Sequence, residues 1–118
     1  MKTNLDMNLL ENKKLAFNML NSPNIRLSSM VGKQISAKVY VIDDIENVNQ
    51  ETGEAHAIQR LVIRDAEGET YHTMGKGLVE SFTRLLDVFG DSWGDGFNLV
   101  VKQINTSTGK HTYTFDVV

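Results

Sequence analysis

Hydrophobic and polar residues alternate with a period of two in several stretches of the chain, which is typical of strands that bury one face. Between the second and third stretches lies a short polar tetrad that ends in Gly68, and such a tetrad favours a hairpin turn. The pattern therefore predicts five strands, over residues 35–42, 57–64, 69–74, 97–102 and 112–118.

A helical period interrupts this β pattern at two places. One stripe of apolar residues with helical spacing ends before Gly90, and it consists of Leu78, Phe82, Leu85, Leu86 and Phe89. Within residues 1–20, apolar positions recur at partial helical spacing, and Asp6 is a candidate cap. Pro23 disfavours helix at the residue before it, so we expect a short N-terminal helix that ends near residue 21.

The order of these elements predicts the architecture. Three antiparallel strands, one helix and two further strands are the order of a five-stranded OB-type Greek-key barrel, with the helix between strands 3 and 4. A split α+β sheet uses the same elements, but a barrel leaves no exposed strand edge and is favoured. We expect a mainly β domain over residues 28–118, preceded by a helical or irregular extension over residues 1–27.

Composition limits the class of protein. A chain of 118 residues is long enough for one hydrophobic core, and the absence of cysteine excludes disulfides and thiolate metal sites. The sequence has no apolar run long enough to span a bilayer and no signal-peptide pattern, so a cytoplasmic protein without a membrane partner is expected.

Charge is unevenly distributed along the chain. The net charge is −3, but residues 43–54 hold five acids and no Lys or Arg, which leaves 12 basic and 10 acidic residues elsewhere, or +2. An acidic loop at 43–54 thus leaves room for a basic surface, and the charge balance permits a nucleic-acid partner without indicating one.

The first two strands carry a candidate binding face. If Ile35, Val39, Leu61 and Ile63 point inward, the opposite parity presents outward the cationic and aromatic residues Lys38, Tyr40, Arg60 and Arg64. A four-residue turn places Tyr71 on the same face, whereas a one-residue change in the turn substitutes His72. The alternative is that the tyrosines are half-buried packing residues and the arginines are solvated or paired with acids.

Three further residues are weaker candidates for contact with DNA. Trp93 lies in a glycine-rich loop, where an indole either stacks on a base or, more often, packs over the end of a barrel. Lys110 flanks the last turn, which borders the ligand groove in OB-folds, and Lys102 lies on the outer parity of its strand. Both lysines could reach a phosphate, although both also suit an ordinary charged surface.

Other chemistries find no support in the sequence. The three histidines are not spaced as metal ligands, and the segment that begins at Asp91 lacks the ligand pattern of a calcium loop. The glycine-lysine pairs at 75–76 and 109–110 lack the other residues of a nucleotide-binding motif. We therefore expect neither an enzyme nor a cofactor.

Several short runs carry a family resemblance. They are residues 68–71, 77–82, 86–93, 101–104 and 114–117. Together they resemble the single-stranded DNA-binding proteins of phages that infect Gram-positive bacteria, over residues 28–118. The resemblance implies an OB-type protein that coats single-stranded DNA during phage DNA replication, without sequence preference or cofactor. The acidic tail common in bacterial relatives is absent.

Two hypotheses follow from the sequence. In the first, the outer face of the early strands binds single-stranded DNA by base stacking and phosphate contacts. In the second, the same barrel is a small protein-interaction adaptor that docks a partner through residues 43–54 or through the N-terminal segment. The sequence leaves open a homo-oligomer, contacts with replication proteins and the choice between DNA and RNA.

Overall fold

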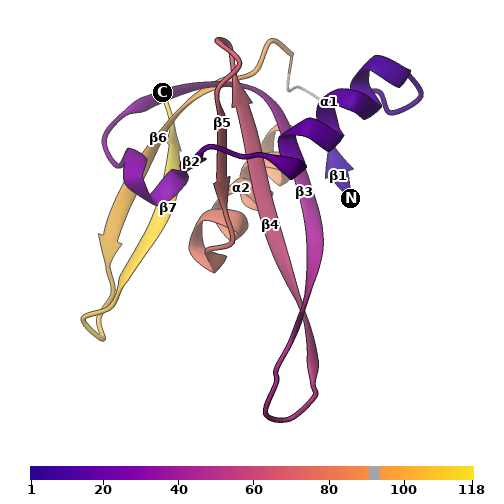
Figure 1. The fold of residues 1–118 in the computed structure, drawn as a ribbon. Helices are drawn as coiled ribbons and strands as arrows, with labels where there is room; N and C mark the ends of the chain where they lie inside the picture. Colours follow the sequence, from indigo (N-terminus) through magenta and orange to yellow (C-terminus); the bar gives the residue numbers. More distant parts are fainter. Residues whose placement is uncertain (91–93) are drawn as a thin grey trace.

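One curled sheet organises the protein, as the computed structural model shows for residues 1–90 and 94–118 (Figure 1). Its strands are β1 (Lys2–Thr3), β2 (Ile25–Arg26), β3 (Gln34–Val48), β4 (Ala55–Asp65), β5 (Thr70–Thr73), β6 (Phe97–Asn105) and β7 (His111–Val117). The helices are α1 (Leu10–Asn21), the 3-10 turn η1 (Leu27–Met30) and α2 (Lys76–Phe89). The mainly β class is thus confirmed, and the described chain holds two long helices, with α1 before β2 and α2 between β5 and β6.

The sheet forms a half-barrel rather than the closed five-stranded barrel that the element order predicts. Its strands follow the order β2-β5-β4-β3-β6-β7, and β1 pairs with β3. The short β2 pairs in parallel with the outer edge of β5, so β5 and β7 are not neighbours in the described part of the sheet. The 3-10 turn η1 contacts both β5 and β6 across this opening. The N-terminal segment therefore supplies two strands that the alternation did not reveal.

The two long helices pack on opposite faces of the sheet. Helix α2 lies inside the curl and contributes Phe82 to the main hydrophobic core, together with residues of β3 to β7. Helix α1 lies on the outer face (Figure 1) and buries Ala16 and Met19 against Val41 and Val62 in a second, smaller cluster. Part of the outer face is consequently covered by the N-terminal segment and unavailable to a ligand.

A β-bulge in β3 decides which side chains face the main core. The pairing with β4 shifts register between Ala37 and Val39, and such an irregularity reverses the facing of every later residue in the strand. Ala37 before the bulge and Tyr40 after it therefore both lie in the main core, where the Tyr40 and Phe82 rings meet edge to face at 5.1 Å. The prediction that Tyr40 faces outward is wrong, because strict alternation does not hold through the bulge.

Gly96 packs directly against this bulge. It adopts φ +97°, and a Cβ atom at this position would overlap the carbonyl oxygen of Ala37. Only glycine fits such a close approach of two backbones at a positive φ.

The turn between β4 and β5 buries Tyr71. Ile63 pairs with Tyr71 and Val62 pairs with His72, so the outward prediction is wrong for Tyr71 and the alternative, His72, is correct. The Tyr71 hydroxyl donates to Asp65 Oδ2 at 2.8 Å, while Asp65 Oδ1 accepts the backbone N–H groups of residues 67 and 69. Burial, followed by this carboxylate, raises the pKa of Tyr71 to about 12.

The first half of the segment expected to be an acidic loop is strand. Strand β3 continues to Val48 and β4 begins at Ala55, so the two form a long hairpin arm that projects from the body (Figure 1). The acids Asp44, Glu46, Glu51 and Glu54 are exposed on it. The hydrophobic pattern is weak here because a two-stranded arm in water buries little of either face.

We predict that Tyr40→Ala lowers the free energy of unfolding by about 3 to 5 kcal/mol, because it removes a large aromatic side chain from a packed core. Urea denaturation measures this effect. Phe17→Ala is the matched control, since Phe17 on α1 is 66% exposed whereas Tyr40 is 6% exposed, and we expect a change within about 0.5 kcal/mol for it. Equal effects of the two substitutions would contradict the assignment of Tyr40 to the core.

Candidate nucleic-acid interface

The outer face of β4, β5 and β2 gathers cationic and imidazole side chains. Arg60 and Arg64 share one parity of β4 with Val62, and Val62 pairs with His72 of β5. The parallel pairing of β2 with β5 sets Arg26 directly beside His72. The predicted residues Arg60, Arg64 and His72 thus do share a face, and Arg26 joins them.

Sequence reasoning missed Arg26 because it assigned residues 1–27 to an extension. The sequence holds one short sign of a strand after Pro23. Apolar and polar residues alternate there, and the structure shows Ile25 half-buried, Arg26 exposed and Leu27 buried. Three residues are too few to distinguish a strand from a loop by periodicity.

Arg60 is held by an acid from the neighbouring strand. Its Nε and Nη2 atoms lie 3.2 and 3.1 Å from the two carboxylate oxygens of Asp43, which is the residue paired with it in β3. The two side chains are 20% and 21% exposed. This bidentate pair orients the guanidinium and offsets part of its charge, so Arg60 alone is a weaker attractor of phosphate than its position suggests.

The pKa of His72 is lowered from the ordinary histidine value of 6.5, first by burial and then by the charges of Arg26 and Arg60. This lowering favours the neutral form of the imidazole. A neutral, half-buried ring between two guanidinium groups offers a flat surface that adds no positive charge of its own.

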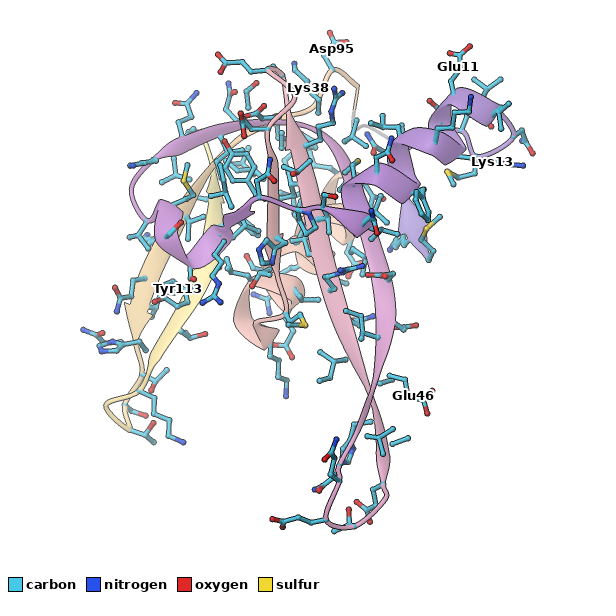
Figure 2. All side chains as sticks on the ribbon, viewed as in Figure 1. Glu11, Lys13, Lys38, Glu46, Asp95 and Tyr113 are labelled. Carbon is cyan, nitrogen blue, oxygen red and sulfur yellow. The ribbon has the colours of Figure 1, made fainter. Side chains whose placement is uncertain are left out.

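Arg64 lies at the far end of this face, and the three predicted lysines lie elsewhere. Arg64 folds back over the turn, since a Cβ atom on Gly68 would lie 3.2 Å from its Nη2 atom. Lys38, at the bulge, donates to the backbone carbonyl of Asp95 at 2.5 Å (Figure 2). Lys102 on β6 pairs with Asp116 at 3.3 Å, and Lys110 is exposed in the β6–β7 turn.

Trp93 lies outside the described residues. Tyr40 and Tyr71 are each 6% exposed, so neither presents a ring face to a ligand on this surface. Of the nine predicted residues, the structure brings together Arg60, Arg64 and His72.

The described ranges 1–90 and 94–118 contain no group of three His, Asp or Glu side chains arranged to hold a metal ion. Their helices include none that is long and apolar enough to cross a bilayer.

Comparison with protein families identifies the partner. The model of the family described as phage single-stranded DNA-binding protein matches residues 1–118. The chain belongs to this family. The match confirms the resemblance found in the sequence and extends it through the N-terminal segment, which the resemblance had left out. No curated protein and no solved structure matches. The partner of this phage single-stranded DNA-binding protein is single-stranded DNA, and its role lies in phage DNA replication.

The lowered pKa of His72 predicts a dependence of stability on pH. Because the folded protein holds the His72 proton less tightly than the unfolded chain does, stability is fully present above about pH 6.5 and declines as the pH falls through the lowered pKa. Thermal melts between about pH 7.5 and about pH 5 should show a steeper loss for the wild type than for His72→Gln. Parallel curves for the two proteins would contradict this assignment.

Proposed function

We propose that this protein coats single-stranded DNA without sequence preference, and that the strand lies on the outer face of β4, β5 and β2. The observation that supports this site is the meeting of Arg26, Arg60 and His72 on one surface of a protein whose family binds single-stranded DNA. In this proposal Arg26 and Arg60 hold phosphates. Arg64 lies on the same side of β4 but beyond Val62, which α1 covers.

The buried Tyr40 and Tyr71 cannot stack on bases, so we assign base stacking to His72 and its neighbours. The neutral His72 ring supplies a flat surface, and the half-buried Ile58 lies two residues from Arg60 on the same face of β4. Stacking on such surfaces tolerates every base, because each base has a π-face, and phosphate contacts carry no sequence information. The proposed contacts are therefore independent of sequence.

The charge of the β3–β4 arm supports a path across the body of the protein. The arm exposes Asp44, Glu46, Glu51 and Glu54, with Glu46 on its flank (Figure 2). These carboxylates repel a phosphate backbone, so the strand crosses the base of the arm near Arg60 and does not follow the arm to its tip. The arm remains available for the adaptor role considered from the sequence, which no observation favours over DNA binding.

Fluorescence anisotropy with labelled oligo-dT, measured over a series of salt concentrations, tests the proposed face. We predict that Arg26→Glu weakens binding and reduces the slope of log K against log salt concentration by about 1, because one phosphate contact is lost. Arg84→Glu is the matched control, since Arg84 is an exposed arginine on α2, on the opposite face of the sheet. Oligomers of dA and dC should bind with affinities similar to that of dT.

Two results would separate the parts of this proposal. If the wild type fails to bind oligo-dT at about 50 mM salt, where counterion release favours binding most, coating of single strands is wrong for this protein. If the wild type binds but Arg26→Glu and Arg84→Glu have the same small effect, the strand lies on another surface.

A further inference from the structure

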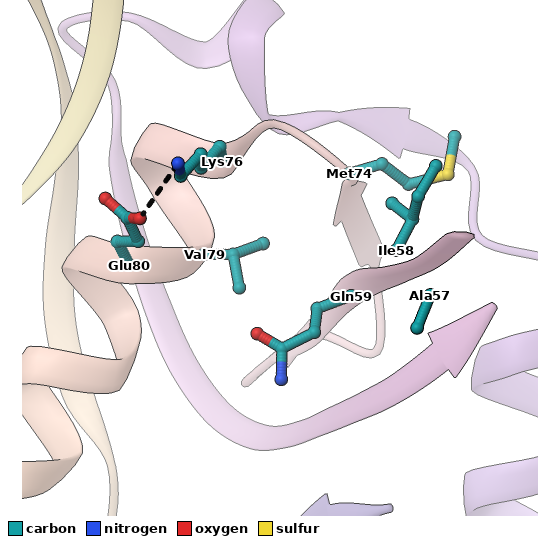
Figure 3. Close-up of a pocket in the computed structure, with 7 residues that line it drawn as sticks. All are labelled: Ala57, Ile58, Gln59, Met74, Lys76, Val79 and Glu80. Atoms are coloured by element: carbon teal, nitrogen blue, oxygen red, sulfur yellow. Dashed lines mark ion pairs between the residues drawn. The ribbon is translucent and has the colours of Figure 1, made fainter. Parts of the chain in front are cut away.

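Two clefts open where β5 leads into α2, on the floor between the β3–β4 arm and the β6–β7 hairpin. The first has a volume of about 330 Å³ and lies between β4 and α2, with Ile58, Gln59, Met74 and Val79 on its walls (Figure 3). The second has a volume of about 460 Å³ and lies between α2, η1 and β7, with Ser28, Thr73, His111 and Tyr113 on its walls. Both volumes fall in the range of small-molecule sites. Lys76 lines both clefts and so forms the ridge between them.

We propose that single-stranded DNA crosses this ridge, with one nucleobase in each cleft and a phosphate at the Lys76 ammonium group. This inference rests on the proposed function and extends its site from the outer face to residues that neither the sequence reasoning nor the family match assigns.

The first cleft is continuous with the proposed outer face. Ile58 lies two residues from Arg60 along β4, and Met74 follows two residues after His72. Residues two apart on a strand point to the same side, so Ile58 shares the side of Arg60, and Met74, just after the end of β5, lines the same cleft as Ile58. A DNA strand that leaves Arg60 therefore reaches this cleft next. Met74 is 56% exposed, and a thioether makes favourable contacts with flat rings.

Lys76 is poised for a phosphate. Its side chain is 89% exposed, and its Nζ atom lies 3.9 Å from Glu80 Oε1 one helical turn away (Figure 3). An exposed pair at this separation stabilises a helix only slightly. The ammonium group can therefore exchange the carboxylate for a phosphate at little cost.

The second cleft contains the half-buried aromatic ring of Tyr113. One side of this residue packs against the main core while it also lines the cleft. The structure records no hydrogen bond of the Tyr113 hydroxyl to another described residue. His111 stands beside it, with Nδ1 held 2.8 Å from Asn105 Oδ1. A phenol ring packed on the core and an oriented imidazole in one cleft suit a stacked base better than they suit an apolar ligand.

The close packing of α2 on β7 shapes this second cleft. A Cβ atom on Gly77 would overlap the side chain of Thr112 and lie 2.8 Å from the Tyr113 carbonyl oxygen. Glycine at this position lets the first turn of α2 approach β7, and it thereby brings Lys76 and Tyr113 to the same cleft.

Oligo-dT and an abasic oligomer of equal length distinguish base contacts from phosphate contacts in the full-length protein. We expect Lys76→Glu to weaken binding of both oligomers and to reduce the salt slope by about 1. We expect Tyr113→Leu to weaken binding of oligo-dT by roughly five- to a hundredfold and to leave the abasic oligomer unaffected, while Tyr113→Phe retains the ring and the affinity. Arg84→Glu, which makes the same charge change on the same helix, is the control for Lys76→Glu.

The inference is wrong if Lys76→Glu behaves like Arg84→Glu, or if Tyr113→Leu binds oligo-dT as the wild type does. Should Tyr113→Leu fail to fold by thermal melting, photo-crosslinking of the wild type to iodouracil-substituted dT decides instead. Crosslinks in the peptides that hold Met74, His111 or Tyr113 support the clefts, and crosslinks confined to other peptides overturn them. One outcome separates this inference from the proposed function. If the wild type binds oligo-dT and binding is weakened by Arg26→Glu but not by Lys76→Glu, this inference is wrong and the proposed function stands.

Discussion

The bulge between Ala37 and Val39 is the constraint on which the rest of this structure depends. It lets one strand serve two cores, because residues on both sides of the bulge reach the cluster around Phe82 while Val41 turns toward α1. Without the shift, Tyr40 would face outward and Val41 would enter the main core. Because the phenols are buried, the proposed DNA contacts are made by cations, an imidazole and the clefts beside α2.

The N-terminal segment packs on the β domain and adds a residue to the proposed binding face. Helix α1 covers Val41 and Val62, β1 extends the pairing of β3, and β2 adds Arg26 to the edge of β5. The same segment continues as η1, which spans the opening between β5 and β6. The pairing that covers the edge of β5 also positions a cation beside His72, so the proposed site depends on this pairing.

Regular periodicity made most of the fold predictable, and local irregularity accounts for the errors. The stripe from Leu78 to Phe89 and the alternation of β4 are uninterrupted, so α2 and the facing of Arg60 and Arg64 followed from the sequence. The facing of Tyr40 did not, because the bulge depends on a close approach of Gly96 that no local pattern encodes. Strand β2 was not predicted, because its two residues acquire strand geometry only by pairing with β5.

The central claim is that DNA follows the outer face of β4 and β5 onto the floor between the two hairpins, while the tyrosines of β3 and β5 stay in the core. Titration of the isotopically labelled protein with oligo-dT, followed by amide chemical shifts in NMR spectra, tests this claim most directly. The account predicts the largest shifts at Arg26, near Arg60, over residues 72–77 and over residues 111–113, with small shifts at the tip of the acidic arm. Shifts concentrated on the arm or on the exposed side of α1 would contradict it.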